Sequence, residues 1–209
     1  MKTLLYIETS PLKERSYSTM IATNFIETYK KEHPNDRVET IDLWSYFIPE
    51  FNGDTIKAKY RILHGQKHTP SESKAWRKIV DIFEVFNSAD KYLISIPMWN
   101  FGIPYKLKHY IDVITQPGLA FSYSPEEGYK GLVSNKPITV IYARGGEYSS
   151  NSQMQKMDVQ KPYIETWLKF IGFTDIKSII IEPTLSNTEN VEKAKAVAEI
   201  EVLKIARNF

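Results

Sequence analysis

The sequence predicts an α/β protein in which a five-stranded parallel β-sheet is covered by helices on both faces. Short apolar runs rich in β-branched residues alternate along the chain with longer segments of helical periodicity. Such runs are typical of strands buried on both faces, which occur in parallel sheets with helices on each side. With 209 residues, 42% of them hydrophobic, the chain can form one substantial core. We therefore expect residues 1–209 to form a single domain.

Five apolar runs are predicted to be the strands. Thr3–Glu8 is the first, and a turn-like His-Pro-Asn-Asp sequence at residues 33–36 precedes the second. Pro97 ends the third run, because proline cannot continue the ladder of a central strand. The predicted strands span residues 3–8, 38–43, 92–96, 137–142 and 176–181.

Segments of helical periodicity separate these strands. In the first, apolar residues from Ile21 to Tyr29 recur at helical spacing, and Ser16 or Ser18 is available as the N-cap. Further helices are predicted over residues 71–87, 107–114, 163–170 and 189–206. Residues 44–70 are less regular, with a moderately helical middle, and covering substrate is one use of such an insert. Strands that alternate with helices require right-handed crossovers, and five strands at this length suit a flavodoxin-like, doubly wound fold.

Charge and residue usage exclude several classes of protein. The 27 basic and 25 acidic side chains give a net charge of +2, which is too even for a nucleic-acid binder. The absence of cysteine excludes disulfides, thiolate nucleophiles and iron–sulfur clusters. His64 and His68 stand four residues apart but lack the glutamate of a zinc motif, so we expect no metal site. The first apolar run is too short for a membrane span, and we expect a cytoplasmic protein without a membrane partner.

Ligands of doubly wound sheets bind beyond the carboxyl ends of the strands, so the segments that follow the strands are the candidate sites. Residues 10–18, after the first strand, run directly into a helix and contain several hydroxyls. Hydroxyls and unpaired N–H groups at a helix N-terminus suit a phosphate, and Arg15 adds positive charge. The glycine patterns of dinucleotide and nucleoside triphosphate loops are absent. A loop in which a serine merely caps the helix is the alternative interpretation.

The third strand is followed by a segment rich in aromatic residues, Pro97-Met98-Trp99-Asn100-Phe101. Two large aromatic side chains and a methionine cannot all be buried here, because loops lie on the surface. Planar apolar side chains around an amide suit a flat heteroaromatic ring with polar edges. An aromatic cluster that packs against a helix is the alternative.

The fourth strand is followed by residues 143–150, which contain the pair Gly145-Gly146. Adjacent glycines permit close approach of the backbone or a positive φ, and expose N–H groups that can bind the carbonyl edge of a ring. A glycine turn without a ligand is the alternative. We expect the first, third and fourth strands to be adjacent, so the three segments together indicate a site for a mononucleotide with a large flat ring, which is FMN.

The residues also resemble a known family, the FMN-dependent NADH azoreductases, which are also called NADH:quinone oxidoreductases. The resemblance covers most of the chain, and its marks are, in order, residues 97–101, 107–108, 110–112, 118–123, 131–133, 144–146 and 170–172. It implies a homodimer in which Tyr123 and Phe170 border the substrate space. The serines and the Tyr17 backbone are implied to hold the FMN phosphate, and the other residues to surround the ring. The expected cofactor-binding residues are Ser10, Ser16, Tyr17, Ser18, Pro97, Met98, Trp99, Asn100, Phe101, Ala143, Arg144, Gly145 and Gly146.

The resemblance further implies the activity. FMN carries the redox chemistry, so no side chain is expected to be catalytic. NADH or NADPH is the expected electron donor, and quinones and azo compounds are the expected acceptors. We expect a ping-pong reaction, and the resemblance implies a role in protection against electrophilic quinones. The chain departs from the family pattern at Trp99, where tyrosine is common, at Ala143, where serine is common, and at Tyr17, which replaces a smaller polar residue. We expect these departures to affect substrate preference more than flavin binding.

Two other functions fit the fold class. A flavodoxin-like electron carrier without NADH oxidation is the main alternative, although carriers of that kind present an acidic face and a tighter, Thr/Gly-rich phosphate loop. A phospho-accepting or ligand-sensing domain needs a cluster of carboxylates at the strand ends, where this sequence offers Glu8 near the first strand.

Overall fold

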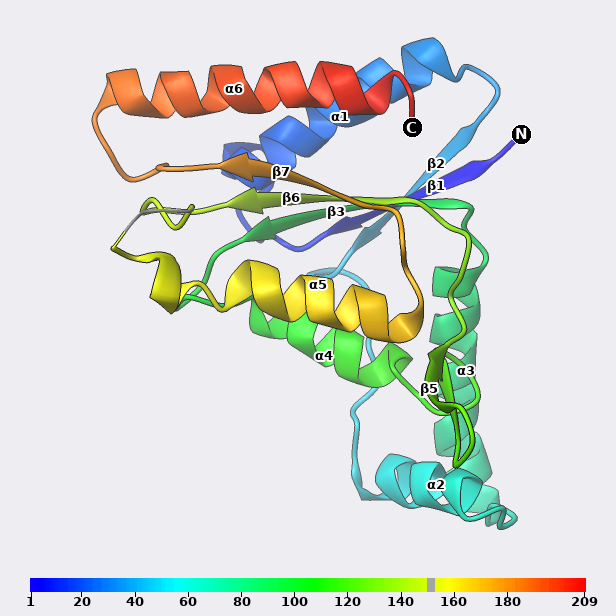
Figure 1. Cartoon of the computed structure of the whole chain (residues 1–209). Coiled ribbons are helices and arrows are strands. Elements are labelled where there is room, and N and C mark those ends of the chain that lie inside the picture. Colours follow the sequence, from blue (N-terminus) through cyan, green and yellow to red (C-terminus); the bar gives the residue numbers. More distant parts are fainter. Residues whose placement is uncertain (150–152) are drawn as a thin grey trace.

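The sheet is five-stranded and parallel, with the strand order β2-β1-β3-β6-β7 (Figure 1). It is seen in a computed structural model that describes residues 1–149 and 153–209; Ser150, in the third predicted ligand segment, lies outside them. Each neighbouring pair of strands is parallel, which confirms the predicted fold class. The strands are β1 (Thr3–Glu8), β2 (Arg37–Asp42), β3 (Lys91–Pro97), β6 (Ile138–Ala143) and β7 (Ile176–Ile181).

Helices cover both faces of this sheet (Figure 1). The two helices α1 (Tyr17–Glu32) and α6 (Thr188–Ala206) lie on one face. The opposite face packs against α3 (Pro70–Asn87), α4 (Tyr105–Ile114) and α5 (Gln160–Ile171). Every helix that the sequence predicts is present. In the described part of the chain, no helix is both long enough and apolar enough to cross a membrane.

Alternation along each strand divides the buried side chains into two cores. On β1, Leu4 and Tyr6 pack toward α1 and α6, whereas Leu5 and Ile7 pack toward α3, α4 and α5. This is the period-two alternation of a strand, with both faces apolar because both are covered. The strand β6, which has a neighbouring strand on each side, is therefore buried at all six positions.

A two-stranded hairpin outside the main sheet was not predicted. It consists of the antiparallel strands β4 (Phe121–Ser124) and β5 (Gly128–Gly131). Its end packs directly on the end of α5, since a Cβ atom at Gly131 would lie 2.3 Å from the Gly172 nitrogen. The Val133 amide also donates to the Ile171 carbonyl. Contacts between distant segments fix the hairpin, so its short sequence gave no local signal.

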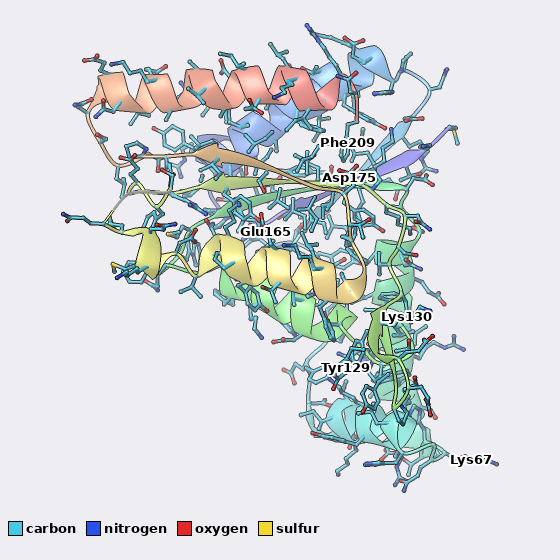
Figure 2. All side chains as sticks on the ribbon, viewed as in Figure 1. Lys67, Tyr129, Lys130, Glu165, Asp175 and Phe209 are labelled. Atoms are coloured by element: carbon cyan, nitrogen blue, oxygen red, sulfur yellow. The ribbon has the colours of Figure 1, made fainter. Side chains whose placement is uncertain are left out.

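Residues 44–70, the less regular segment of the sequence, contain the helix α2 (Gly53–Leu63) and end at Pro70, the first residue of α3. Together with the first turns of α3, α2 forms an arm that extends away from the sheet, as the position of Lys67 shows (Figure 2). A capping box between Thr69 and Glu72 starts α3, and the Glu72 carboxylate lies 2.7 Å from Arg61 Nε on α2. The hydrogen bonds to its carboxylate, the Thr69 amide first, lower the pKa of Glu72 to about 2.

At the amino end of the strands, a buried polar cluster joins both ends of the chain. Asp36 accepts hydrogen bonds from the Tyr29 hydroxyl (2.6 Å) and the Lys2 amide (2.7 Å). The buried Lys91 ammonium donates to the Tyr29 hydroxyl and to the carbonyl of Phe209. The bonds from Tyr29 and Lys2 lower the pKa of Asp36 to about 2.

Replacing Asp36 with asparagine tests this cluster. The pKa of Asp36 is about 2 in the folded protein and near its usual value in the unfolded chain. The carboxylate therefore stabilises the folded state above about pH 4, and this stabilisation is lost as the pH falls toward 2. We expect Asp36→Asn to lower the free energy of unfolding by about 1–2 kcal/mol at pH 7, with the difference from wild type shrinking between pH 4 and pH 2.

Denaturant unfolding at several pH values measures this difference. Asp175→Asn is the control, because Asp175 is 56% exposed and its pairing with Lys177 is worth little. A difference for Asp36→Asn that stays constant down to pH 2 would contradict the electrostatic explanation.

Candidate functional site

The carboxyl ends of β1, β3 and β6 lie next to one another at one edge of the sheet, as the sequence predicts. The parallel register pairs Glu8 with Ser95, and Pro97 with Ala143, so all three strands end together. Both chain termini lie toward the opposite edge (Figure 1). Three loops meet at the carboxyl edge, and we call them the serine loop (residues 9–16), the ring-seat turn (residues 99–102) and the glycine loop (residues 143–149).

The serine loop leads into the N-terminus of α1 and carries buried hydroxyls. Ser10, Ser16 and Ser18 are each no more than 5% exposed. Ser16 is the N-cap residue of α1, but its hydroxyl does not accept a hydrogen bond from the helix and lies 3.1 Å from Ser18 Oγ. The structure confirms Ser16 as the N-cap residue of α1, but its side chain makes no capping hydrogen bond. The first-turn N–H groups of α1 have no side-chain cap within the described residues, and together with the hydroxyls they fit an anion such as a phosphate.

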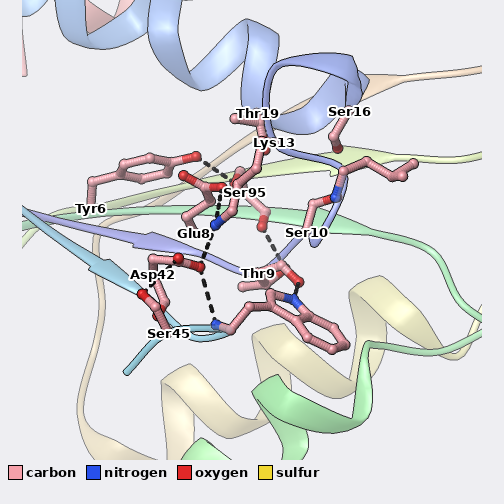
Figure 3. A network of polar contacts seen from close by, with 12 residues as sticks. Tyr6, Glu8, Thr9, Ser10, Lys13, Ser16, Thr19, Asp42, Ser45 and Ser95 are labelled. Atoms are coloured by element: carbon pink, nitrogen blue, oxygen red, sulfur yellow. Dashed lines mark hydrogen bonds and ion pairs between the residues drawn. The ribbon is translucent and has the colours of Figure 1, made fainter. Parts of the chain in front are cut away.

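Lys13 fastens the serine loop to the ends of two strands (Figure 3). Its ammonium lies 3.0 Å from Glu8 Oε1 and 2.5 Å from Asp42 Oδ1, at the ends of β1 and β2. Partial burial acts to lower the pKa of Lys13, but the two carboxylates outweigh it and raise the pKa. Lys13 also has a φ of 52°, a left-handed conformation that is uncommon for a residue with a side chain. The ion pairs hold this bend, and they neutralise carboxylates that would otherwise repel an anion.

Further hydrogen bonds join the serine loop to the central strand. Thr9 Oγ1 donates to the Ser95 carbonyl at 2.7 Å, and the Trp44 indole donates to the Thr9 carbonyl at 2.9 Å (Figure 3). The Tyr6 hydroxyl lies 2.8 Å from Ser95 Oγ. Both Thr9 and Ser95 are fully buried. These bonds fix the loop relative to β3 and to Trp44.

The ring-seat turn is a tight reversal with an unusual backbone. Trp99 and Gly102 exchange two backbone hydrogen bonds of 3.1 and 2.9 Å, and the residues between them, Asn100 and Phe101, have φ values of 48° and 67°. Two successive positive φ values are those of a type I′ turn, which normally contains glycine. Each such residue costs about 1–3 kcal/mol, and strain of this kind persists mainly at functional sites. The turn presents the Phe101 ring, which is 41% exposed, and the exposed Asn100 amide.

Trp99 belongs to an aromatic cluster with Trp44 and Tyr105. The ring centroids of Trp44 and Trp99 are 5.8 Å apart, and Tyr105 lies 5.5 Å from Trp44 and 6.3 Å from Trp99. Trp44, which follows the second strand, was not among the predicted site residues. Considering the segment that follows the second strand, as was done for the first, third and fourth, would have identified it.

In the glycine loop, the side chain of Arg144 is buried behind the loop and not exposed at the carboxyl ends of the strands. It is 1% exposed, donates from Nε to Gln160 Oε1 at 3.1 Å, and lies 2.9 Å from Asp158 Oδ2. Gly145 and Gly146 do not have positive φ values, contrary to one use expected of them. They make room for neighbouring side chains, since a Cβ would lie 2.8 Å from Leu185 Cδ1 at Gly145 and 3.0 Å from Met154 Sδ at Gly146.

Tyr123 and Phe170 do not lie beside the three loops in the same chain. Phe170 stands ten residues along α5 from Gln160, a distance of about 15 Å. Its ring packs at a tilt against those of Phe121 and Tyr129 of the hairpin, and the Tyr129 ring also contacts that of Tyr123. A mainly apolar groove of about 910 Å³ runs between α4 and α5 from Tyr105 to this aromatic group. One end of the groove therefore lies at Tyr105, beside the aromatic cluster of Trp44 and Trp99, and the other lies at Phe170.

The three loops together fit a flavin mononucleotide. The serine loop offers buried hydroxyls and an uncapped helix end for a phosphate. The ring-seat turn offers an exposed aromatic ring and an amide. Between them, Met98 is anchored to β6 through its amide, which donates to the Ala143 carbonyl at 2.8 Å.

The same fold and sequence pattern occur in known proteins. Residues 2–204 match a family model described as a flavodoxin-like fold. The chain is 51% identical to the FMN-dependent NADH:quinone oxidoreductase of Desulfotalea psychrophila, over all of this chain and 98% of that protein. It is 43% identical to the enzyme of the same name from Nitratidesulfovibrio vulgaris strain Hildenborough, over 96% of each chain.

Solved structures agree with these sequence relatives. The fold is similar to that of an azoreductase from Bacillus anthracis strain Sterne, with a TM-score of 0.91 and 30% identity over the full length of both chains. It is also similar to an FMN-dependent NADH-azoreductase of Bacillus anthracis strain Ames Ancestor in complex with FMN. That pair has a TM-score of 0.84 and 28% identity over 99% of this chain and 100% of the other.

Replacing Lys13 with glutamine tests the serine loop as a phosphate site. Loss of the ammonium leaves Glu8 and Asp42 unneutralised beside the loop. We expect Lys13→Gln to weaken FMN binding by about fivefold at low salt, which is about 1 kcal/mol, and to leave riboflavin binding nearly unchanged.

Quenching of flavin fluorescence on titration with apoprotein measures both affinities. Lys57→Gln on the arm, which removes an exposed ion pair with Asp54, is the matched control. Equal losses for FMN and riboflavin would mean that Lys13 shapes the loop without acting on the phosphate.

Proposed function

Because the chain belongs to the flavodoxin-like family of FMN-dependent NADH:quinone oxidoreductases, we propose that it transfers electrons from NADH or NADPH to quinones and azo compounds. FMN, when bound, supplies the hydride acceptance and electron donation that no side chain provides. One observation carries the proposal. The N-terminus of α1, which has no side-chain cap, the buried serines and the strained aromatic turn all lie at the carboxyl ends of the strands. Carriers of electrons share such folds, but the relatives that match the whole chain are named as enzymes.

In this proposal the serine loop binds the phosphate. Ser10, Ser16 and Ser18 donate hydroxyl hydrogens, and the amides at the start of α1, that of Tyr17 included, point toward the same anion. A phosphate gains both from these donors and from the positive end of the helix dipole. Because the loop is fixed by Lys13 and Thr9 before any ligand arrives, little conformational entropy is lost on binding.

The ring-seat turn and the glycine loop hold the flat ring between them. Met98, Trp99 and Phe101 provide apolar surface, and the backbone following Pro97 and Ala143 provides polar groups for the ring edges. Asn100 adds an amide at an exposed position. Arg144 acts behind the glycine loop, where it is buried among acidic residues and Gln160. This chain therefore orients the ring with main-chain groups and supports them with buried side chains.

The reaction is proposed to follow a ping-pong order. NADH and the electron acceptor occupy the same space above the ring-seat turn in succession, so the residues there need only a flat apolar surface for both. Two-electron transfer to a quinone avoids the one-electron product, which suits protection against electrophilic quinones. We further propose that residues 1–209 act as a single domain in the cytoplasm, where nicotinamide cofactors are available.

We also propose that the protein works as a homodimer. Phe170 lies about 15 Å along α5 from Gln160, and Tyr123 belongs to the hairpin that packs near Phe170. Both therefore border the substrate of the loops only if a second chain brings them there. The groove between α4 and α5 is mainly apolar and open, and its walls include Thr166 and Tyr163. A second copy seated on this groove would bury it and close the substrate space.

The first test is spectroscopic. We expect the purified protein to retain FMN after desalting, NADH to bleach its visible absorption anaerobically, and menadione to restore the absorption. Parallel lines in double-reciprocal plots of initial rate are expected from the ping-pong order. Flavin that is retained but not bleached by NADH or NADPH would contradict the enzyme and favour an electron carrier.

The second test concerns the homodimer. Thr166 is exposed in the groove, so arginine there should not disturb the core but should block a second chain. We expect Thr166→Arg to halve the mass measured by light scattering and to lower kcat/KM by at least about tenfold. Val197→Arg on α6, at a position that is 60% exposed on the other face of the sheet, should change neither. A monomeric wild type would contradict the proposal.

A further inference from the structure

One buried glutamine joins the two strand ends that carry the ring-seat turn and the glycine loop. Gln160 is the first residue of α5 and is fully buried. Its side-chain Nε2 donates to the Ile96 carbonyl at 3.1 Å, and its Oε1 accepts from Arg144 Nε at 3.1 Å. Ile96 is the next-to-last residue of β3, and Arg144 directly follows β6. A single amide group therefore spans the gap between the two loops, with both of its ends hydrogen-bonded.

The residues before Gln160 hold the same two loops. The Val159 amide donates to the Phe101 carbonyl at 3.0 Å, within the strained ring-seat turn. Asp158 caps α5 by accepting the amides of Gln160 and Lys161, and its second oxygen lies 2.9 Å from Arg144 NH2. The start of α5 thus contacts the ring-seat turn on one side and the glycine loop on the other.

Arg144 extends the connection to the last strand. Its NH1 lies 3.4 Å from Glu182 Oε2, an atom that also accepts the Tyr148 amide at 2.9 Å. Arg144 is 1% exposed, Asp158 10% and Glu182 7%. Burying one guanidinium and two carboxylates is costly, and apolar residues of similar volume often give equal or greater stability. A buried network of this kind is therefore poorly explained by stability alone.

The strained ring-seat turn also needs support from the structure around it. Asn100 and Phe101 both have positive φ values, a conformation that neighbouring structure must enforce. Two of the described contacts that hold it from outside the turn come from Val159, through the Phe101 carbonyl, and from the Met98 amide, which donates to Ala143. Gln160 fixes the strand that leads into this turn and the residue that follows Ala143.

We propose that Gln160 is a positioning residue, whose side-chain amide sets the spacing between the ring-seat turn and the glycine loop and so shapes the seat of the flavin ring. This inference rests on the proposed function only in naming FMN as the ligand. In this proposal Gln160 makes no direct contact with the flavin ring. It acts through the Ile96 carbonyl and the Arg144 guanidinium, on the two loops that do.

Gln116 offers a matched control elsewhere in the fold. It is also fully buried, and its Nε2 donates to main-chain carbonyls, those of Asp112 and Val113. It follows α4 at the end remote from the three loops. Gln160→Met and Gln116→Met therefore remove the same buried amide and leave side chains of the same shape, but only the first lies between the ligand loops.

The experiment compares these two variants with wild type. Thermal unfolding of the apoproteins measures the structural cost, and titration with FMN measures the dissociation constant. We expect Gln160→Met to weaken FMN binding by at least about tenfold and to shift the visible spectrum of the bound flavin. Gln116→Met should bind FMN as wild type does, even if its melting temperature falls by a similar amount. Equal FMN affinity and identical spectra in the two variants would overturn the inference.

Gln160→Glu provides a second measurement if the methionine variant does not fold. The carboxylate still accepts from Arg144 but no longer donates to the Ile96 carbonyl, and it adds a negative charge behind the glycine loop. We expect weaker FMN binding than wild type and a lower reduction potential of the bound flavin. A potential and an affinity equal to those of wild type would overturn the positioning role.

The wild-type protein separates this inference from the proposed function. A wild type that binds FMN but is not reduced by NADH would contradict the enzyme, while the comparison of Gln160 with Gln116 still decides the positioning role. A wild type without affinity for FMN would overturn both.

Discussion

The parallel pairing of β3 with β1 on one side and with β6 on the other is the constraint on which the rest of the molecule depends. Parallel neighbours require long crossover connections, so every strand must end at the same edge and every return must be made through a helix. That requirement puts the starts of α1, α4 and α5 beside one another. The ligand loops are the short segments between the end of each strand and the start of the next helix. Because they lie there, they can present unpaired backbone N–H groups to a ligand.

Beyond the last ladder bond, buried polar side chains continue the connections between strands. Trp44 bonds to Thr9, Thr9 to Ser95, Gln160 to both Ile96 and Arg144, and Arg144 to Glu182. These contacts run from the end of β2 to the end of β7 in the order of the strands. One backbone hydrogen bond, from the Met98 amide to the Ala143 carbonyl, also joins the ends of β3 and β6. The buried side chains behind the loops add to it, so fewer backbone groups of the loops are needed to hold the loops together.

Much of this fold could be predicted from the sequence because its signals are local. The apolar runs of β1 and β7 gave their bounds, and the carboxyl-end rule placed the serine loop, the ring-seat turn and the glycine loop at one edge. The hairpin could not be predicted, because Gly131 is fixed by the backbone of α5, far away in sequence. The left-handed residues Lys13, Asn100 and Phe101 also lacked a signal, since tertiary contacts and not glycine determine their conformation. For the same reason Arg144 could be placed in the glycine loop, but the direction of its side chain could not.

The aromatic cluster at the ring-seat turn has an optical consequence. The chain contains four tryptophans, and two of them, Trp44 and Trp99, stand with their ring centroids 5.8 Å apart beside the candidate flavin seat. Trp76 and Trp167 are buried on α3 and α5. Indole emission overlaps the near-ultraviolet absorption of an isoalloxazine, so an indole near such a ring passes part of its excitation to it. Binding of the ring beside Trp44 and Trp99 would therefore quench the intrinsic fluorescence of this protein and report occupancy without any attached label.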